Sequence, residues 1–319
     1  MKSNPDQNLI SILIPIHGQA PYLDEVIESI KKQESIEIEV VMVLDRPTSQ
    51  LTALAEKALT NFQMGRLLIS PGSGISDALN FGLNHCSGRY IARIDSDDLM
   101  NKDRLVKQKV FLDRNSEVNC IGTQIVKISE SNSSLGKSKY PTRPSFLRRM
   151  LRVRNCIAHP SVMFRRDEIL KIGGYRSFFD GAEDYDLWIR LNRVGDIANL
   201  DEYLTSYRVW NGQDESEYRK KKNDLSHKVR VFAEIEEIAP QYSTELLSMD
   251  PDVQDAHVAA AEYLKREACL RWKRLEKILQ VDIFLSDRAR ISKLKMVFEI
   301  FQGVIQLSLL SLAIRFTRN

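Results

Sequence analysis

The chain has 319 residues, of which 43% are hydrophobic and 28% charged, and its formal net charge is +3 at pH 7. This length allows one large domain or two modest ones with buried cores, and the balanced charge argues against a dedicated nucleic-acid-binding protein. The four cysteines show no CxxC spacing, which is typical of reduced thiols in a cytosolic protein. The polar N-terminus predicts no signal peptide, and the lack of an 18-residue uncharged apolar run predicts no membrane-spanning helix.

Strand and helix patterns alternate through the first half of the chain. Strands are predicted over residues 9–16, 36–44, 66–69 and 88–94, and helices over residues 22–32, 51–59 and 75–85. This alternation predicts βαβ units and a parallel sheet, in which ligands bind beyond the carboxyl ends of the strands. The strand ends that carry Pro15, His17, Asp45, Arg46 and Gly74 are therefore expected to meet along one edge of the sheet.

Three carboxylates follow the predicted strand over residues 88–94. Asp95, Asp97 and Asp98 cannot continue a buried strand, because desolvating an unpaired carboxylate costs several kcal/mol. Asp95 and Asp97 stand two positions apart, so in extended backbone they face the same side and form an oxygen site suited to Mg²⁺ or Mn²⁺. The alternative is an acidic loop whose side chains cap the next helix.

A glycine-containing turn over residues 71–74 precedes the helix predicted over residues 75–85. Its two glycines are spaced as in a dinucleotide-binding fingerprint, but Asp77 stands where the third glycine belongs. This mismatch argues against a nicotinamide enzyme. Either the backbone amides at the helix start approach a nucleotide or sugar, or the segment is an ordinary loop.

The second half of the chain is less regular. A helix is predicted over residues 104–112, a strand over 118–126, a polar loop or hairpin tip over 129–138, a basic helical turn over 146–153 and a strand over 159–165. A further helix begins near residue 182 with Glu183, Asp184 and Asp186 in its first turn, where carboxylates favour the helix dipole. Three carboxylates beside Tyr185 and Trp188 exceed what a cap needs, so one of them is a candidate general base.

These motifs occur in an order that resembles a known family. The matching segments are residues 11–15, 43–45, 78–82, 88–98, 159–161 and 183–188. Together they resemble family-2 glycosyltransferases with the GT-A fold, from about residue 9 to about residue 207. The resemblance implies an α/β fold with a Rossmann-like, mostly parallel central sheet flanked by helices. The catalytic domain is expected over residues 1–214, and a helical C-terminal region over residues 215–319.

The resemblance also implies a reaction and roles for individual residues. Members usually invert the anomeric centre as they transfer a sugar from a nucleotide-sugar, here expected to be a UDP-sugar, to a hydroxyl group. The expected acceptor is a glycan or lipid-linked glycan in surface polysaccharide biosynthesis, and the expected class is hexosyl- or N-acetylhexosaminyl-transferase. Asp45 matches the residue that binds the nucleotide base. Asp95 and Asp97 match the Asp-x-Asp pair, whose second carboxylate helps to hold a divalent cation, Mn²⁺ or Mg²⁺, on the pyrophosphate.

Asp184 matches the usual catalytic base of the family, and Glu183 is the second choice. The other candidates for binding the nucleotide-sugar are Pro15, His17, Arg46, Gly74, Asn80, Arg93 and Ser96. The candidates for the acceptor side are His159, Asp186 and Trp188, although a lone histidine before proline is more often structural.

Two segments depart from the family pattern. Residues 44–47 read Leu-Asp-Arg-Pro where members often have Asp-Asp-Gly-Ser, so Arg46 either reaches a phosphate or is solvated. Residues 207–211 lack the histidine that many members carry as a further metal or phosphate ligand. The alternatives are a nucleotidyltransferase, which would favour a basic residue within residues 14–18, and a non-catalytic nucleotide-sugar or partner-binding module, against which the retained carboxylates argue.

The C-terminal third reads as basic and helical. Its runs of Lys and Arg at residues 219–222 and 271–274 are typical of a solvated surface. Residues 296–314 gather apolar side chains between basic flanks, so the segment over residues 291–319 is a candidate for peripheral membrane contact. The other interpretations are packing on the catalytic domain and a homodimer seam. We therefore expect a cytoplasmic protein, either free or at the inner face of the membrane.

Overall fold

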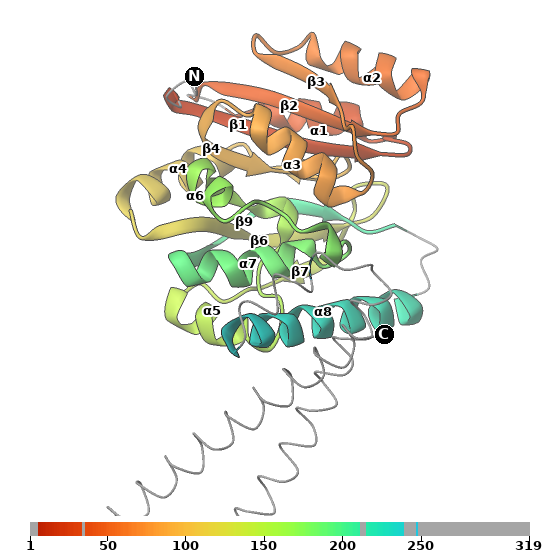
Figure 1. Cartoon of the computed structure of the whole chain (residues 1–319). Helices are drawn as coiled ribbons and strands as arrows, with labels where there is room; N and C mark the ends of the chain where they lie inside the picture. Colours follow the sequence, from red (N-terminus) through yellow and green to blue (C-terminus); the bar gives the residue numbers. More distant parts are fainter. Residues whose placement is uncertain (1–5, 34–35, 211–214, 239–246, 248–319) are drawn as a thin grey trace, which may run out of the picture. The chain divides into compact units, whose positions relative to one another are not determined.

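The computed structural model describes residues 6–33, 36–210, 215–238 and 247. The chain divides into two compact units, Met1–Ser226 and His227–Asn319, and the fold described below is that of the first unit (Figure 1). The predicted domain boundary after residue 214 stays a prediction. The candidate membrane segment over residues 291–319 lies outside the described residues.

The first half of the chain forms the predicted parallel part of the sheet. Its strands are β1 (Asp6–His17), β2 (Ile38–Asp45), β3 (Gly65–Ile69) and β4 (Gly88–Arg93), and its helices are α1 (Leu23–Lys31), α2 (Ser49–Leu59) and α3 (Ile75–His85). β1 lies between β2 and β4 and pairs parallel with both. The apolar residues of β1 and β2 are almost all fully buried, which explains why these strands read as continuous apolar runs.

Close packing of α3 on this sheet depends on Gly82. A Cβ atom at this position would lie 2.3 Å from the Leu13 side chain and 2.8 Å from that of Val43. Only a glycine allows the helix to approach β1 and β2 so closely, and that approach sets the position of the helix N-terminus. In a dinucleotide-binding fingerprint the third glycine allows this close helix–strand packing. Here Asp77 occupies the position of that glycine, and Gly82 allows the close packing instead.

The second half of the chain extends the sheet with mixed strand directions. The strand order is β3-β2-β1-β4-β8-β6-β9-β5, and β7 pairs with β6 outside this path. The added strands are β5 (Leu99–Met100), β6 (Val118–Ile128), β7 (Ser134–Ser138), β8 (Met163–Arg165) and β9 (Asp196–Arg208). β6 and β9 are parallel, whereas β8 runs antiparallel to both β4 and β6. The sheet is thus parallel from β3 to β4 and mixed beyond.

The remaining described helices are α4 (Arg104–Arg114), α5 (Pro144–Met150), α6 (Arg166–Lys171), α7 (Glu183–Val194) and α8 (Glu215–Ile238). The strand predicted over residues 159–165 is too long, because His159–Ser161 form a 3₁₀ turn. Pro160 has no N–H to donate to a strand ladder, which favours the turn. Within the described residues, no helix is both long enough and apolar enough to cross a membrane.

Candidate active site

The carboxyl ends of β1 and β2 bring three predicted residues together around Asp45. His17 is paired with Asp45 across the two strands, and its Nδ1 lies 3.1 Å from Asp45 Oδ2. The Gly74 N–H, at the start of α3, donates to the same oxygen over 3.2 Å, and Arg46 Nε donates to Oδ1 over 3.2 Å. The predicted meeting of these strand ends along one edge is present in the structure.

These contacts keep the Asp45 carboxylate ionised although its side chain is only 4% exposed. Burial alone would raise the pKa of Asp45, but the Gly74 amide, Arg46 and His17 together lower it below its ordinary value. Gly74 adopts a φ of +95°, and a Cβ there would lie 2.4 Å from Asp180 Oδ2. A glycine is therefore required at the point where the chain turns into α3.

The acidic residues after β4 form one group. Asp95, Asp97 and Asp98 each offer a carboxylate oxygen, and the three oxygens lie within 4.8 Å of one another. Arg93 holds Asp95 through both of its terminal nitrogens, one of them at 2.6 Å from Oδ2. Asp98 is 1% exposed, and its Oδ2 has no hydrogen-bond partner among the described residues.

The electrostatics of this group suit a hard cation. Burial and then the charge of Asp95 raise the pKa of Asp97. Burial followed by the charges of Asp95 and Asp97 raises the pKa of Asp98 well above its ordinary value. A divalent ion would relieve this repulsion and satisfy the orphan oxygen of Asp98, and carboxylate oxygens are the ligands that Mg²⁺ and Mn²⁺ prefer. The residues present therefore fit the predicted cation.

Two residues at the end of β9 contact this acidic group. The Trp210 Nε1–H donates to Asp97 Oδ2 over 2.7 Å, and the Trp210 ring lies edge-on to Tyr22 with centroids 5.3 Å apart. The Arg208 backbone N–H donates to Asp98 Oδ1 over 2.7 Å, and Arg208 Nε donates to the Asp97 carbonyl over 2.8 Å. Residues 207–211 lack the histidine that many family members carry. In this segment Trp210 instead contacts Asp97, a predicted metal ligand.

A second acidic pair, Glu183 and Asp184, opens α7. Asp184 is half-buried, and its Oδ2 accepts a hydrogen bond from Asn155 Nδ2 over 2.7 Å. Glu183 is buried, and its Oε2 accepts from the Gly181 N–H over 2.7 Å. Burial, followed by the charge of Asp184, raises the pKa of Glu183 to about 7. The two neighbouring carboxylates therefore have different environments and different chemistry.

Arg93 interacts with both acidic groups: it bonds Asp95, and its charge acts on Glu183. His159 Nε2 and the Tyr175 hydroxyl lie 2.8 Å apart, and His159 Nδ1 lies 3.7 Å from Glu183 Oε1. Burial and then the charge of Arg93 lower the pKa of His159 well below its ordinary value, so this imidazole is neutral at pH 7. Arg93 also lowers the pKa of Glu183, against the larger effects of burial and Asp184. The buried His159–Tyr175 pair thus lies beside both Arg93 and Glu183.

The structure places several predicted residues in other roles. Both ends of the Asn80 amide bond the backbone of Tyr175, each over 2.8 Å. Asp186 is buried between Arg176 and Arg190, whose Nε atoms lie 3.0 and 2.9 Å from its Oδ2. Both oxygens of Asp186 are engaged by arginines, which makes this residue an internal ion-pair partner within the described structure.

The other predicted residues differ in exposure. Trp188 is fully buried and lies edge-on to His159 with ring centroids 5.8 Å apart, so its surface is not offered to a glycan. Pro15 is buried in β1, Ser96 is half-buried, and Arg46 is exposed with a φ of +49°. The left-handed backbone of Arg46 is uncommon for a residue other than glycine, asparagine or aspartate.

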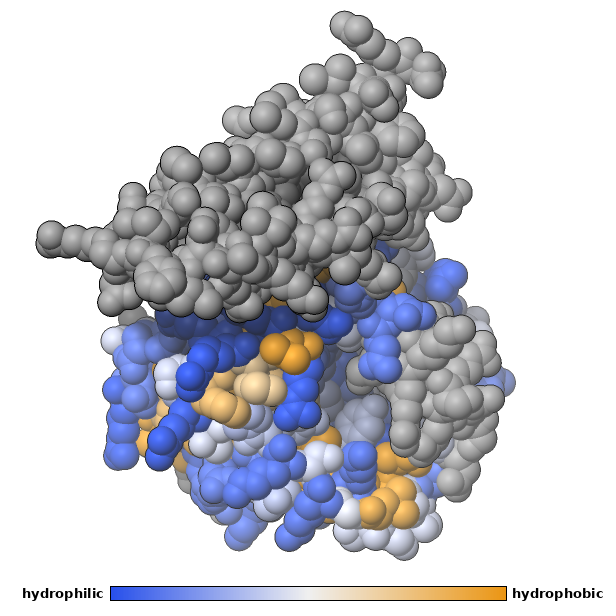
Figure 2. Space-filling view, turned by 90° about the horizontal axis from the view of Figure 1, so that it is seen from below, coloured by the Kyte–Doolittle hydropathy of each residue, from blue (hydrophilic) through white to orange (hydrophobic). Residues whose placement is uncertain are grey.

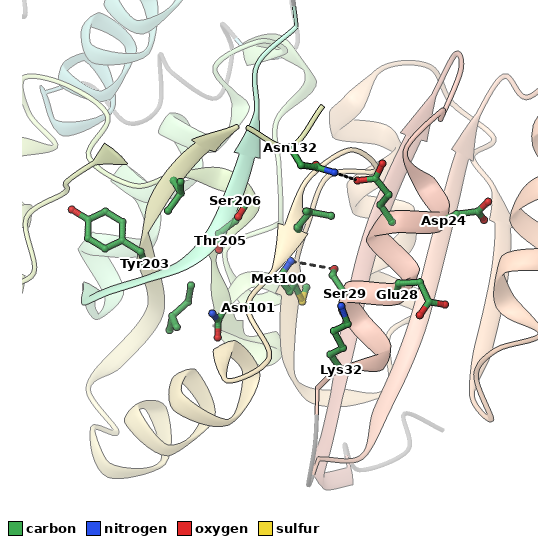
Figure 3. Close-up of a pocket in the computed structure, with 14 residues that line it drawn as sticks. Asp24, Glu28, Ser29, Lys32, Met100, Asn101, Asn132, Tyr203, Thr205 and Ser206 are labelled. Atoms are coloured by element: carbon green, nitrogen blue, oxygen red, sulfur yellow. Dashed lines mark hydrogen bonds between the residues drawn. The ribbon is translucent and has the colours of Figure 1, made fainter. Parts of the chain in front are cut away.

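Two described cavities lie away from Asp97 and Asp184. One of about 620 Å³ lies between α1 and β9, with Glu28, Lys32 and Tyr203 among its lining residues (Figure 3). In it, Asn132 donates to Glu25 over 3.0 Å, and the Met100 N–H donates to the Ser29 hydroxyl over 3.1 Å (Figure 3). The other, of about 410 Å³, is lined by the glycine turn and by α3 residues between Asp77 and Asn84.

Sequence reasoning missed several residues that complete the site. Asn155 reaches Asp184 across 29 positions and Trp210 reaches Asp97 across 113, so no local spacing could reveal either contact. Asp180, near Gly74, and the Tyr175 hydroxyl, near His159, are likewise set by the tertiary fold. One signal was available: Asp186 and Arg190 stand four positions apart on a helix, a spacing that favours an ion pair.

Comparison with known proteins agrees with this architecture. TarS of S. aureus, residues 1–349 in complex with UDP-GlcNAc, aligns with a TM-score of 0.55 at 18% identity over 81% of this chain and 72% of that one. Among curated proteins, the O-antigen biosynthesis glycosyltransferase WbnJ of Escherichia coli is 34% identical over 208 residues, which is 64% of this chain and 81% of the relative. The UDP-Gal:alpha-D-GlcNAc-diphosphoundecaprenol beta-1,3-galactosyltransferase of Escherichia coli is 29% identical over 189 residues, 58% of this chain and 68% of the relative.

The sheet and its structural neighbours define an α/β fold of the GT-A class. The model of the family described as "Glycosyl transferase family 2" matches residues 11–172. The chain belongs to this family. The expectation drawn from the ordered sequence motifs is thereby confirmed.

Proposed function

We propose that this chain is an inverting transferase that moves a sugar from a UDP-sugar to a hydroxyl group of a glycan or lipid-linked glycan in surface polysaccharide biosynthesis. The observation that carries the proposal is the presence of two separate carboxylate groups, Asp95–Asp98 and Glu183–Asp184, near the buried Arg93. A displacement at the anomeric carbon needs one site for the charged leaving group and another for a base.

On the donor side, Asp45 is the proposed acceptor of hydrogen bonds from the nucleotide base. Its pKa is lowered below the ordinary value despite burial, so it is an anion at neutral pH, and it lies beside the Gly74 amide at the start of α3. His17 and Arg46 are exposed side chains in contact with it, and we assign them to the phosphates or ribose. The backbone amides at the α3 N-terminus add a favourable dipole for an anion.

Asp97 and Asp95 would hold the divalent cation, Mn²⁺ or Mg²⁺, with Asp98 as the carboxylate behind them. When bound, such an ion stabilises the negative charge that grows on the departing nucleoside diphosphate. Arg93 orients Asp95 through a two-point contact. Trp210 donates to Asp97 Oδ2, one of the carboxylate oxygens that would bind the cation.

On the acceptor side, Asp184 is the proposed general base and Glu183 the second choice. Asp184 takes the proton of the acceptor hydroxyl as the hydroxyl oxygen bonds to the anomeric carbon and the bond from that carbon to the phosphate oxygen breaks. The bond electrons leave with UDP. Asn155 fixes the carboxylate of Asp184, whereas the pKa of Glu183 near 7 leaves that group partly protonated at neutral pH.

The acceptor is proposed from the relatives. One is named for O-antigen biosynthesis, and another for a GlcNAc acceptor on diphosphoundecaprenol. We therefore propose a lipid-linked glycan as the acceptor and propose that the chain acts in the cytoplasm at the inner face of the membrane. The transferred group would be a hexosyl or N-acetylhexosaminyl residue.

The test is sugar transfer to a lipid-diphosphate-linked acceptor from a panel of UDP-sugars, measured as released UDP with Mn²⁺ or with a chelator. Asp184→Asn should lower kcat by roughly 10²–10⁴-fold, the usual contribution of a general base. Glu183→Gln serves as the matched control, because it removes the neighbouring carboxylate and should retain most of the activity. Full activity in Asp184→Asn would refute the assigned base, and UDP-sugars that give no product with any acceptor would favour a binding module.

A further inference from the structure

A strongly basic segment surrounds α5. Between residues 137 and 154 the chain carries seven basic residues and no acidic one, although the whole chain has a net charge of only +3. The seven are Lys137, Lys139, Arg143, Arg148, Arg149, Arg152 and Arg154, and all of them are exposed. More than twice the net charge of the protein is thus concentrated on one short surface segment.

Most of these arginines have no acidic partner. Arg148 pairs with Asp196 at 2.5 Å and Lys139 pairs with Asp201 at 3.1 Å. No ion pair is present at Arg143, Arg149, Arg152 or Arg154 among the described residues. Protein surfaces that only contact solvent usually carry positive and negative side chains interspersed. Four arginines without an acidic partner therefore favour binding of an anionic partner.

The same segment exposes large apolar side chains. Leu147 and Leu151 are buried and anchor the helix, whereas Phe146 is 44% and Val153 62% exposed. Phe146, Arg149 and Val153 follow at spacings of three and four, which places them on one side of α5 and the helical turn after it. The Arg149 guanidinium lies 5.8 Å from the Phe146 ring centroid. We call Arg143, Phe146, Arg149, Arg152, Val153 and Arg154 the α5 face.

The coloured surface in Figure 2, which looks at the molecule from below, has hydrophobic residues in small groups among mostly hydrophilic ones. Arginines around single apolar side chains are typical of contacts with an anionic lipid surface, where the apolar groups enter the interface and the cations bind headgroups. A protein-binding patch would have a larger contiguous apolar area. The charge and the apolar side chains of the α5 face together point to lipid.

The α5 face is rigidly connected to the candidate base. The Tyr185 hydroxyl, next to Asp184 on α7, donates to the Leu151 carbonyl over 2.6 Å. Asn155, one residue beyond Arg154, donates to Asp184 itself over 2.7 Å. A surface that held this segment on a membrane would therefore keep Asp184 close to groups displayed at that membrane.

We propose that the α5 face docks this chain on an anionic membrane surface, with Phe146 and Val153 in the headgroup region and the unpaired arginines on lipid phosphates. The docking goes beyond the proposed function and does not depend on it, because vesicle binding is measured without donor or acceptor. It also differs from contact through residues 291–319, because it uses residues of the first unit.

The test is co-sedimentation of the full chain with vesicles of phosphatidylcholine alone or mixed with phosphatidylglycerol. The variant Arg143→Gln/Arg149→Gln/Arg152→Gln should bind the mixed vesicles on the order of 100-fold more weakly, because each basic residue at such a surface contributes roughly a factor of five. The matched control is Lys57→Gln/Lys102→Gln/Arg114→Gln, which removes the same charge from three other exposed positions. Equal binding by the α5 variant and the wild type, or an equal loss in the control, would overturn the proposal.

A second measurement locates the contact. In Phe146→Trp, the added indole emission should shift to the blue with the mixed vesicles and not with phosphatidylcholine alone, relative to the wild-type chain. An unshifted spectrum while the chain still sediments with the vesicles would mean that another surface binds. A shift with a single-stranded oligonucleotide and none with vesicles would assign the α5 face to nucleic acid. Either result would contradict the proposal.

Discussion

Glu183 and Asp184 show how neighbouring residues of one charge type acquire different chemistry. Glu183 is buried beneath the His159–Tyr175 pair, whereas Asp184 is half-buried and held by Asn155. Burial disfavours the charged form of Glu183, and the nearby Asp184 charge adds to that effect. Glu183 therefore titrates close to pH 7, whereas Asp184 is the more exposed carboxylate at the start of α7.

This difference predicts a pH-dependent stability. The folded pKa of Glu183, about 7, lies above its ordinary value of 4.5, so the protonated form favours folding and this stabilisation is lost as the pH rises from about 4.5 through 7. Above pH 7 the buried charge costs about 3 kcal/mol, since each pKa unit corresponds to about 1.4 kcal/mol. Glu183→Gln should therefore raise the melting temperature at pH 8 and leave it nearly unchanged near pH 4.5. An equal shift at both pH values would contradict the assigned pKa.

The contact between Trp210 and Asp97 predicts an optical signal of cation binding. A cation held by Asp97 would lie close to the Trp210 indole, whose N–H contacts that carboxylate, so paramagnetic Mn²⁺ should quench Trp210 emission in the presence of UDP. Trp210→Phe should lose most of this quenching, because Trp210 is the tryptophan whose indole contacts the predicted cation ligand Asp97. Mg²⁺ is the control ion, since it is not paramagnetic. Equal quenching in the variant and the wild type would mean that the cation binds elsewhere.

At the scale of elements, Arg208 connects the end of β9 to three other parts of the first unit. Its guanidinium donates to the carbonyls of Ser129 and Glu130 in the β6–β7 turn, each over 3.1 Å, and pairs with Glu25 of α1 at 3.0 Å. It also lies 3.8 Å from the centroid of the Tyr22 ring and bonds the Asp97 carbonyl. Arg208, together with Arg93 and Trp210, therefore holds the acidic loop in position.

Removal of that side chain should affect both stability and cation binding. Arg208→Gln removes a buried guanidinium that donates to three carbonyls and pairs with Glu25, and breaking a buried charged network of this kind costs roughly 3–5 kcal/mol. The expected result is a clearly lower melting temperature and weaker Mn²⁺-dependent binding of UDP. Lys107→Gln is the control, because its pair with Glu202 is exposed and should contribute little. If both variants melt together with the wild type, Arg208 is not a structural connection.

Helices and strands with a strong hydrophobic pattern could be predicted from the sequence. Strands that exist only because they pair with a distant strand could not. The strands and helices from β1 to α3 follow from buried apolar runs and helical spacing. β9 escaped prediction because Asp201 and Glu202 interrupt its apolar residues, and only pairing along β6 makes it a strand. Likewise β5 has two residues, and it exists because Leu99 and Met100 pair with β9.

At the scale of the whole molecule, the same distinction holds for the site. The alternation of strand and helix patterns was enough to predict the meeting of Asp45 with His17 and Gly74, and the ordered set of motifs was enough to predict the family. The partners that tune these groups, such as Asn155 for Asp184 and Trp210 for Asp97, depend on how distant segments fold together. The burial of individual side chains could not be predicted either. Asp186 and Trp188, which were candidates for the acceptor side, are buried.

We propose that the two carboxylate groups have separate roles in one reaction: Asp97 helps to bind the cation, and Asp184 accepts the proton of the acceptor hydroxyl. The most direct measurement is calorimetric titration of UDP into the full chain with and without Mn²⁺, for the wild type, Asp97→Asn and Asp184→Asn. Asp97→Asn should lose the Mn²⁺-dependent part of the affinity by roughly tenfold or more, as expected when a metal ligand is removed. Asp184→Asn should bind UDP and Mn²⁺ as the wild type does, since its loss is confined to catalysis. Unchanged Mn²⁺-dependent affinity in Asp97→Asn, or an equal loss in both variants, would contradict the claim.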